Sequence, residues 1–210
     1  ANFGHSLLGT SLMTSVTKGM HKALHIPQWT PAMPKPYYPN RAQVLTLESP
    51  QKVVYFPSCI NQTMGLEKKS PHELPIINKM ASLLHKAGYE IIFPKDMDNL
   101  CCGTIRESKG MPEVADRKVK ELAYALWDAS EHGKYPVLCD QSPCLHRMRQ
   151  CINKMKLYEP AEFIYTFLKD KLEFTQTNTP IAVHVTCSMK RMGLANQIIG
   201  LAKLCSSNVL

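Results

Sequence analysis

The chain lacks the features that mark several common classes of protein. It has no apolar run approaching the ~18–20 residues that cross a bilayer, which predicts that no segment spans a membrane. It has no basic leader followed by an apolar stretch, which predicts that it is not secreted. With 10 Gly and 15 Pro among 210 residues, and 44% hydrophobic residues, it is neither a low-complexity chain nor a largely disordered one.

The charge of the chain also lacks a pattern. The formal net charge is +8, but the basic residues are scattered and form no long run. Nucleic acid is therefore not an expected partner, and at most a weak attraction to anionic lipid remains. One helical stretch carries a basic face, which we expect to be solvated or to contact acidic headgroups or a partner domain; its residues are Arg147, Arg149, Lys154 and Lys156.

The number of cysteines is the most informative feature of the composition. There are eight, and without a secretory signal they are expected in a reducing compartment, as metal ligands rather than disulfides. We therefore expect a cytoplasmic location. Because the sequence begins at Ala1 and ends at Leu210 without a recognisable cap or stop, we also expect it to be a piece of a longer chain.

The first 50 residues differ in pattern from the rest. Leu12, Val16, Met20 and Leu24 lie four residues apart and predict a short amphipathic helix over 11–25. Six prolines between residues 26 and 50 predict a stiff, partly extended connector. We therefore expect residues 1–25 to be the helical remnant of a preceding domain, 26–49 a Pro-rich linker and 50–210 the main domain.

Short apolar runs and amphipathic stretches alternate after residue 50. The runs predict strands at 53–56, 89–93, 137–138 and 181–185. The stretches predict helices that start at 70 or at 75 and end at 88, and others over 112–133, from 145, over 161–168 and over 194–204. Strands separated by helices imply parallel pairing, so the expected fold is α/β, with βα repeats, a mainly parallel sheet and helices on both faces.

Five cysteines come at the ends of the predicted strands or in the turns that follow them. They are Cys59, Cys101, Cys102, Cys139 and Cys144. In a parallel sheet these strand ends lie along one edge, so we expect the side chains to converge there. Adjacent cysteines make a strained disulfide, whereas thiolates are good ligands of iron–sulfur clusters and of zinc.

Other residues near these motifs have simpler interpretations. Cys151 and Cys205 lie in amphipathic helical stretches and are expected to pack as small hydrophobic residues. Asp140, in the turn between Cys139 and Cys144, is expected to cap that turn, with tuning of a bound cluster as the alternative.

The spacing of Cys59, the Cys101-Cys102-Gly103 motif and the pair Cys139 and Cys144 resembles that of the cysteine-rich CCG domain. This domain occurs in heterodisulfide reductases, in the iron–sulfur component of glycolate oxidase and in flavin- and iron–sulfur-dependent D-lactate dehydrogenases. The stretches that resemble the last group most are 53–60, 101–110, 135–148 and 184–194. The usual Cys-x-x-Cys pair is replaced here by Cys139-x4-Cys144.

The resemblance implies an iron–sulfur electron-transfer domain of a D-2-hydroxyacid (D-lactate) dehydrogenase. It implies a 4Fe-4S cluster held by Cys59, Cys101, Cys102 and Cys144, with Cys139 and Cys187 as further cofactor-binding residues. A first repeat would span about 50–170, and a truncated second repeat, starting with Cys187 and its preceding strand, about 180–210.

The implied partners lie outside this sequence. They are preceding ferredoxin-like and FAD domains of the same chain and a quinone or cytochrome acceptor, with a peripheral contact at the inner face of the plasma membrane. The piece by itself is expected to be inactive. Two alternatives stay open at this point: a structural zinc or thiol interaction module, and a component of a glycolate oxidase or heterodisulfide reductase-like complex.

Overall fold

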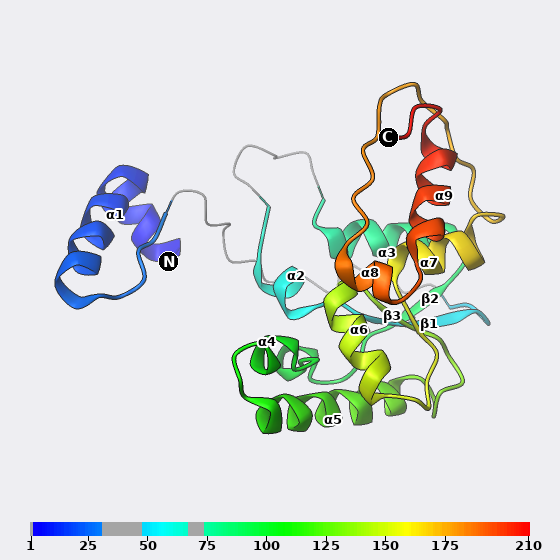
Figure 1. The fold of residues 1–210 in the computed structure, drawn as a ribbon, viewed down its shortest axis with the longest axis horizontal. Coiled ribbons are helices and arrows are strands. Elements are labelled where there is room, and N and C mark those ends of the chain that lie inside the picture. The colour runs from blue at the N-terminus through cyan, green and yellow to red at the C-terminus, as the bar shows by residue number, and fades with distance from the viewer. Residues whose placement is uncertain (1, 31–47, 67–73) are drawn as a thin grey trace.

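The computed structural model describes residues 2–30, 48–66 and 74–210, with side chains described from residue 9 onward in the first range. Four strands and a larger number of helices follow one another along these ranges (Figure 1). The strands are β1 (Lys52–Phe56), β2 (Glu90–Ile92), β3 (Val137–Cys139) and β4 (Leu157–Tyr158). The longer helices are α1 (Asn2–Leu24), α3 (Ile76–Lys86), α5 (Pro112–Ala129), α6 (Ser142–Cys151) and α9 (Ala195–Cys205). The short helical turns are α2 (Cys59–Thr63), η2 (Met97–Asn99), α4 (Thr104–Glu107), α7 (Pro160–Phe163), η3 (Ile164–Leu168) and α8 (Cys187–Arg191).

The four strands form one parallel sheet in the order β2-β1-β3-β4. Val54 is in register with Ile92 of β2 on one side and with Val137 of β3 on the other. The predicted α/β class and parallel pairing are therefore confirmed. The two-residue strand β4, which was not predicted from the sequence, pairs with β3 and forms one edge of the sheet.

Helices cover both faces of the sheet, and the central strands are therefore buried on both of their faces. In β1 the residues alternate: Val54 and Phe56 belong to a cluster formed with α5 and α6. Val53 and Tyr55 belong to a second cluster, formed with α3, α7 and η3. Figure 1 shows α3 and α7 on one side of the strands and α5 on the other. This is the two-sided burial that a near-continuous apolar strand predicts.

The two main crossover helices begin and end close to their predicted positions. α5 starts at Pro112, and its buried stripe is the predicted one of Ala115, Val119, Leu122 and Leu126. α3 starts after Pro75, the second of the two predicted starts, and Gly88 follows its end with a φ of 79°. The alternative start at Ser70 lies outside the described residues.

The predicted strand over 181–185 is wrong. This segment is extended but joins no sheet; isolated parallel bridges link Thr177 with Ser206 and Ile181 with Val209. Its backbone bonds therefore go to the last residues of the chain, and its side chains are half-buried or exposed. An alternating β-rich pattern shows that a segment can extend, but a strand also needs a partner, and here the partner is a short tail.

The apolar stripe of α1 is exposed. Leu12, Val16, Met20 and Leu24 keep 50%, 43%, 41% and 64% of their surface accessible. The helix is broken at Gly9, whose φ of 65° and ψ of 174° are not helical, so the regular part begins close to the predicted residue 11. Most of the predicted Pro-rich linker, residues 31–47, lies outside the described residues.

Candidate functional site

The candidate site lies at the carboxyl edge of the sheet, where the chain order of the strands reverses. After β1 the chain forms β2 on one side of β1 and then returns to form β3 on its other side. Open α/β sheets bind ligands in the crevice outside such a reversal. The loops after β1, β2 and β3 carry Cys59, the Cys101-Cys102 pair and Cys144 to this edge.

Cys59 is the first residue of a short helix that begins directly after β1. The Ser58 side chain accepts a hydrogen bond from the Asn61 N–H at 3.4 Å and so caps this helix. Cys59 itself is exposed. An extended strand followed at once by a capped helix fixes the direction in which the Cys59 side chain leaves the sheet.

The Cys101-Cys102-Gly103 segment makes a tight turn between η2 and α4. Gly103 has a φ of 84°, a left-handed conformation that favours glycine. A Cβ atom at Gly103 would lie 2.4 Å from the Ala115 carbonyl oxygen, so the turn packs directly against the backbone of α5. The glycine of the motif is therefore required both by backbone conformation and by close approach.

Cys144 lies in the first turn of α6, next to the same segment. The Cys102 sulfur lies 3.2 Å from the Thr104 hydroxyl oxygen, and this hydroxyl lies 3.5 Å from the Pro143 carbonyl oxygen. The hydroxyl of Thr104 thus connects the turn after β2 with the start of α6.

Cys59, Cys101, Cys102 and Cys144, which we call the thiol row, shift one another's pKa in that order along the edge. Hydrogen bonding with Cys102 and then with Cys59 lowers the pKa of Cys101 far below its ordinary value, helped by the Gly103 N–H, which donates to the Cys101 sulfur at 3.3 Å. Hydrogen bonding with Cys101, followed by burial, raises the pKa of Cys59. Interaction with Cys101 and Cys144 likewise raises the pKa of Cys102, and interaction with Cys102 lowers the pKa of Cys144. Cys101 is therefore the sulfur best prepared to carry negative charge.

Asp140 ties the first and third loops together. Its carboxylate accepts a hydrogen bond from the Ser58 N–H at 2.7 Å and another from the Tyr55 hydroxyl at 2.9 Å. Tyr55 belongs to β1 and Ser58 directly precedes Cys59, whereas Asp140 follows β3. Asp140 therefore acts across the two strands, where the sequence analysis expected a cap of its own turn.

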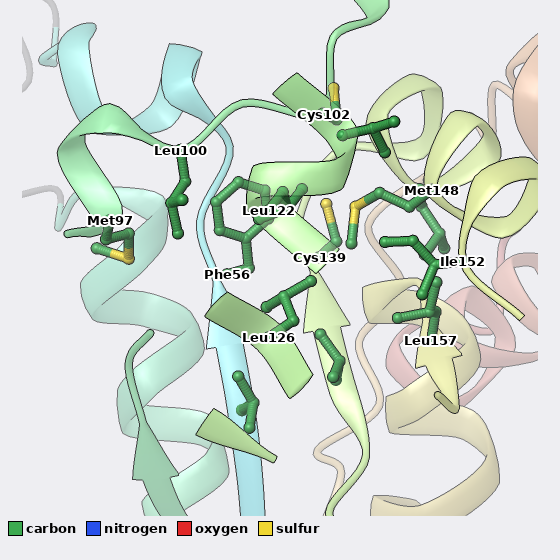
Figure 2. Close-up of a cluster of buried hydrophobic side chains, with 14 residues drawn as sticks. Phe56, Met97, Leu100, Cys102, Leu122, Leu126, Cys139, Met148, Ile152 and Leu157 are labelled. Carbon is green, nitrogen blue, oxygen red and sulfur yellow. The ribbon is translucent and has the colours of Figure 1, made fainter. Parts of the chain in front are cut away.

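The other predicted cofactor-binding cysteines lie outside the thiol row. Cys139 is fully buried in the core cluster on the α5–α6 face, where Figure 2 shows it among Leu122 and Met148, and burial raises its pKa. Cys187 is exposed as the first residue of α8, after the capping residue Thr186. Its setting repeats that of Cys59 after Ser58.

Cys151 and Arg147 lie in surroundings other than those predicted from the sequence. Cys151 is exposed and Cys205 is half-buried, so Cys151 does not pack in the core as expected. Arg147, expected on a solvated basic face, is 3% exposed and lies beneath the Cys101-Cys102 turn. Its partners Glu107 and Asp116 are distant in the sequence, and no local pattern identifies them.

The residues of the thiol row fit a thiolate-bound metal group by their chemistry. All four donors are soft sulfur ligands, and one already receives an N–H···S hydrogen bond of the type that stabilises cluster thiolates. In the ranges that the structure describes, however, no three Cys, His, Asp or Glu side chains are already arranged around one point as metal ligands are. The row thus brings the donors together without closing them into a cage.

Comparisons with known proteins add no relative. No protein-family model, curated protein or solved structure matches this chain. Across the described ranges, no helix combines the length and the apolar character that crossing a bilayer requires.

Proposed function

We propose that this chain is an iron–sulfur electron-transfer domain of the CCG type. The observation that carries the proposal is the thiol row, in which three loops of a parallel sheet place Cys59, Cys101, Cys102 and Cys144 at one edge, where neighbouring thiols shift one another's pKa. Zinc and iron–sulfur clusters both take four such donors. The sequence motif Cys101-Cys102-Gly103 favours the cluster.

In this proposal the protein supplies the ligands, their orientation and part of their charge balance. Cys101 holds the thiolate that the Gly103 N–H stabilises. Asp140 keeps the Cys59 loop against the turn that precedes Cys144. A bound cluster supplies one-electron transfer, with a potential that depends on its hydrogen bonds and exposure.

The wider assignment rests on the sequence motif. We infer that the domain belongs to a flavin-dependent D-2-hydroxyacid dehydrogenase, most similar to D-lactate dehydrogenases. Electrons from FAD on a preceding domain would pass through a ferredoxin-like domain and this one to a quinone or cytochrome. The cytoplasmic side of the membrane, with a peripheral contact, is the location that this role requires.

Anaerobic reconstitution with iron and sulfide tests the proposal. The wild-type chain is expected to become brown and to bind iron and sulfide in stoichiometric amounts. Cys101→Ser and Cys102→Ser are expected to lose this iron, because each removes a member of the thiol row. Cys151→Ser is the matched control, since Cys151 is a free cysteine outside the row. It is expected to bind as much iron as the wild type.

The outcomes separate the alternatives. A colourless protein with stoichiometric zinc and no bound iron would replace the electron-transfer assignment with the structural zinc module. Equal iron loss from Cys151→Ser and Cys101→Ser would show that the thiol row is not the ligand set.

A further inference from the structure

Arg147 is a buried cation with three partners, one of them the backbone of the Cys101-Cys102 turn. Its Nε donates to the Cys102 carbonyl oxygen at 3.1 Å. One terminal nitrogen pairs with Asp116 at 2.7 Å and the other with Glu107. The Arg147 side chain is 4% exposed, whereas the two carboxylates are 52% and 60% exposed at the rim. A single guanidinium therefore joins the turn, the end of α4 and the start of α5 to α6.

Besides the Thr104 contact with α6 and the buried Cys102 side chain, two contacts hold the turn in place. α4 is a helix of four residues, and Gly103 at its start has no side-chain cap. Gly103 packs against Ala115, and Arg147 binds the next residue of α5, Asp116. The turn thus lies between two helices: Gly103 packs closely against α5, and the guanidinium of Arg147 reaches the turn from α6. The Arg147 bond goes to the backbone of Cys102, a member of the thiol row.

Arg149, two residues later on α6, gives a natural comparison. It also binds a backbone carbonyl, that of Leu157, and a carboxylate, that of Glu162, at 2.6 Å each. These partners belong to β4 and α7, not to the turn. The two arginines make the same kinds of bond and differ in what they hold.

We propose that Arg147 is a positioning residue for the thiol row: it fixes the Cys102 carbonyl, and so the directions in which the adjacent thiols Cys101 and Cys102 point toward a bound metal. This inference rests on the proposed function, since it needs a metal group at the row. The role is geometric. The charge of Arg147 is already opposed by two carboxylates, whereas its three-way fork has no equivalent in another side chain.

Anaerobic titration with Co²⁺ alone tests the role, because the visible spectrum of bound Co²⁺ reports the number and the arrangement of its thiolates. Arg147→Met is expected to weaken Co²⁺ binding by about 10-fold to 100-fold, the range found when residues that orient metal ligands are lost. Its spectrum is expected to change as well. Arg147→Lys keeps the charge but loses the fork, so it is expected to behave like Arg147→Met. Arg149→Met is expected to match the wild type in affinity and spectrum.

Each outcome decides between the claims. A wild type that binds neither Co²⁺ nor iron would remove the proposed function and this inference with it. If the wild type binds Co²⁺ and Arg147→Met binds it as the Arg149→Met control does, the inference alone is wrong. Recovery of wild-type binding by Arg147→Lys would overturn it too, because charge would then suffice. Circular dichroism establishes folding, and if Arg147→Met does not fold, Arg147→Lys decides.

Discussion

Replacing Gly103 by alanine separates the two reasons for a glycine in the Cys101-Cys102-Gly103 turn. Gly103 and Gly88 have similar positive φ angles, 84° and 79°. An added Cβ at Gly103 meets the Ala115 carbonyl oxygen at 2.4 Å, whereas one at Gly88 meets nothing within 4 Å. Gly88→Ala therefore carries the backbone strain alone, and Gly103→Ala carries the strain together with the clash.

The two substitutions are expected to differ clearly in free energy of unfolding. A left-handed conformation costs a residue with a side chain about 1–2 kcal/mol. Forcing an extra methyl group into a packed region costs a further ~1–3 kcal/mol, and here the obstacle is helix backbone that moves only together with α5. We therefore expect a loss of about 1 kcal/mol for Gly88→Ala and about 3 kcal/mol for Gly103→Ala.

Equilibrium unfolding in urea, followed by circular dichroism, measures both losses on the metal-free chain. Co²⁺ affinity provides a second measurement, since Gly103→Ala moves the turn that carries two thiols and Gly88→Ala does not. Equal losses of stability for the two variants would refute the argument that the turn packs against α5.

Two further predictions concern the carboxyl groups of Asp140 and Glu159. Asp140→Ala leaves the Ser58 N–H and the Tyr55 hydroxyl without their acceptor; we expect it to cost ~3 kcal/mol in urea unfolding and to weaken Co²⁺ binding, whereas Tyr55→Phe should cost ~1 kcal/mol. Equal effects of the two changes would show that the bond to Ser58 contributes nothing. Burial raises the pKa of Glu159 above its ordinary 4.5, so the folded state binds this proton more tightly and its contribution to stability declines as the pH rises from 4.5 through the raised pKa. Glu159→Gln is expected to lack that decline when unfolding is measured from about pH 4 to about pH 7, and an unchanged pH profile would contradict this.

The parts of the fold that were predictable are those whose signal is local. Four consecutive apolar residues, 53–56, mark a strand buried on both faces. The stripe that starts at Ala115 marks the buried side of α5. The position of the cysteines after successive strands was equally readable, because parallel pairing brings the strand ends to one edge.

The parts that were not predictable depend on distant partners. β4 has two residues, too few for a period, and exists because β3 offers it an edge. The segment 181–185 has the composition of a strand, yet its pairing is decided by the tail at 206–210. Arg147 looks like any surface arginine until Glu107 and Asp116 are brought beside it by the packing of α4 and α5 on α6.

The strand order has a consequence for how the thiol row comes into being during folding. Pairing of β1 with β2 collects Cys59, Cys101 and Cys102, but Cys144 arrives when β3 has paired with β1 and α6 has formed after it. Closing that long loop is among the slow, entropically costly steps for a chain of this topology. Helix formation by itself assembles no part of the row. A complete set of four neighbouring thiols therefore requires β1 to be paired with both β2 and β3, so the row exists only when the two central strands have met.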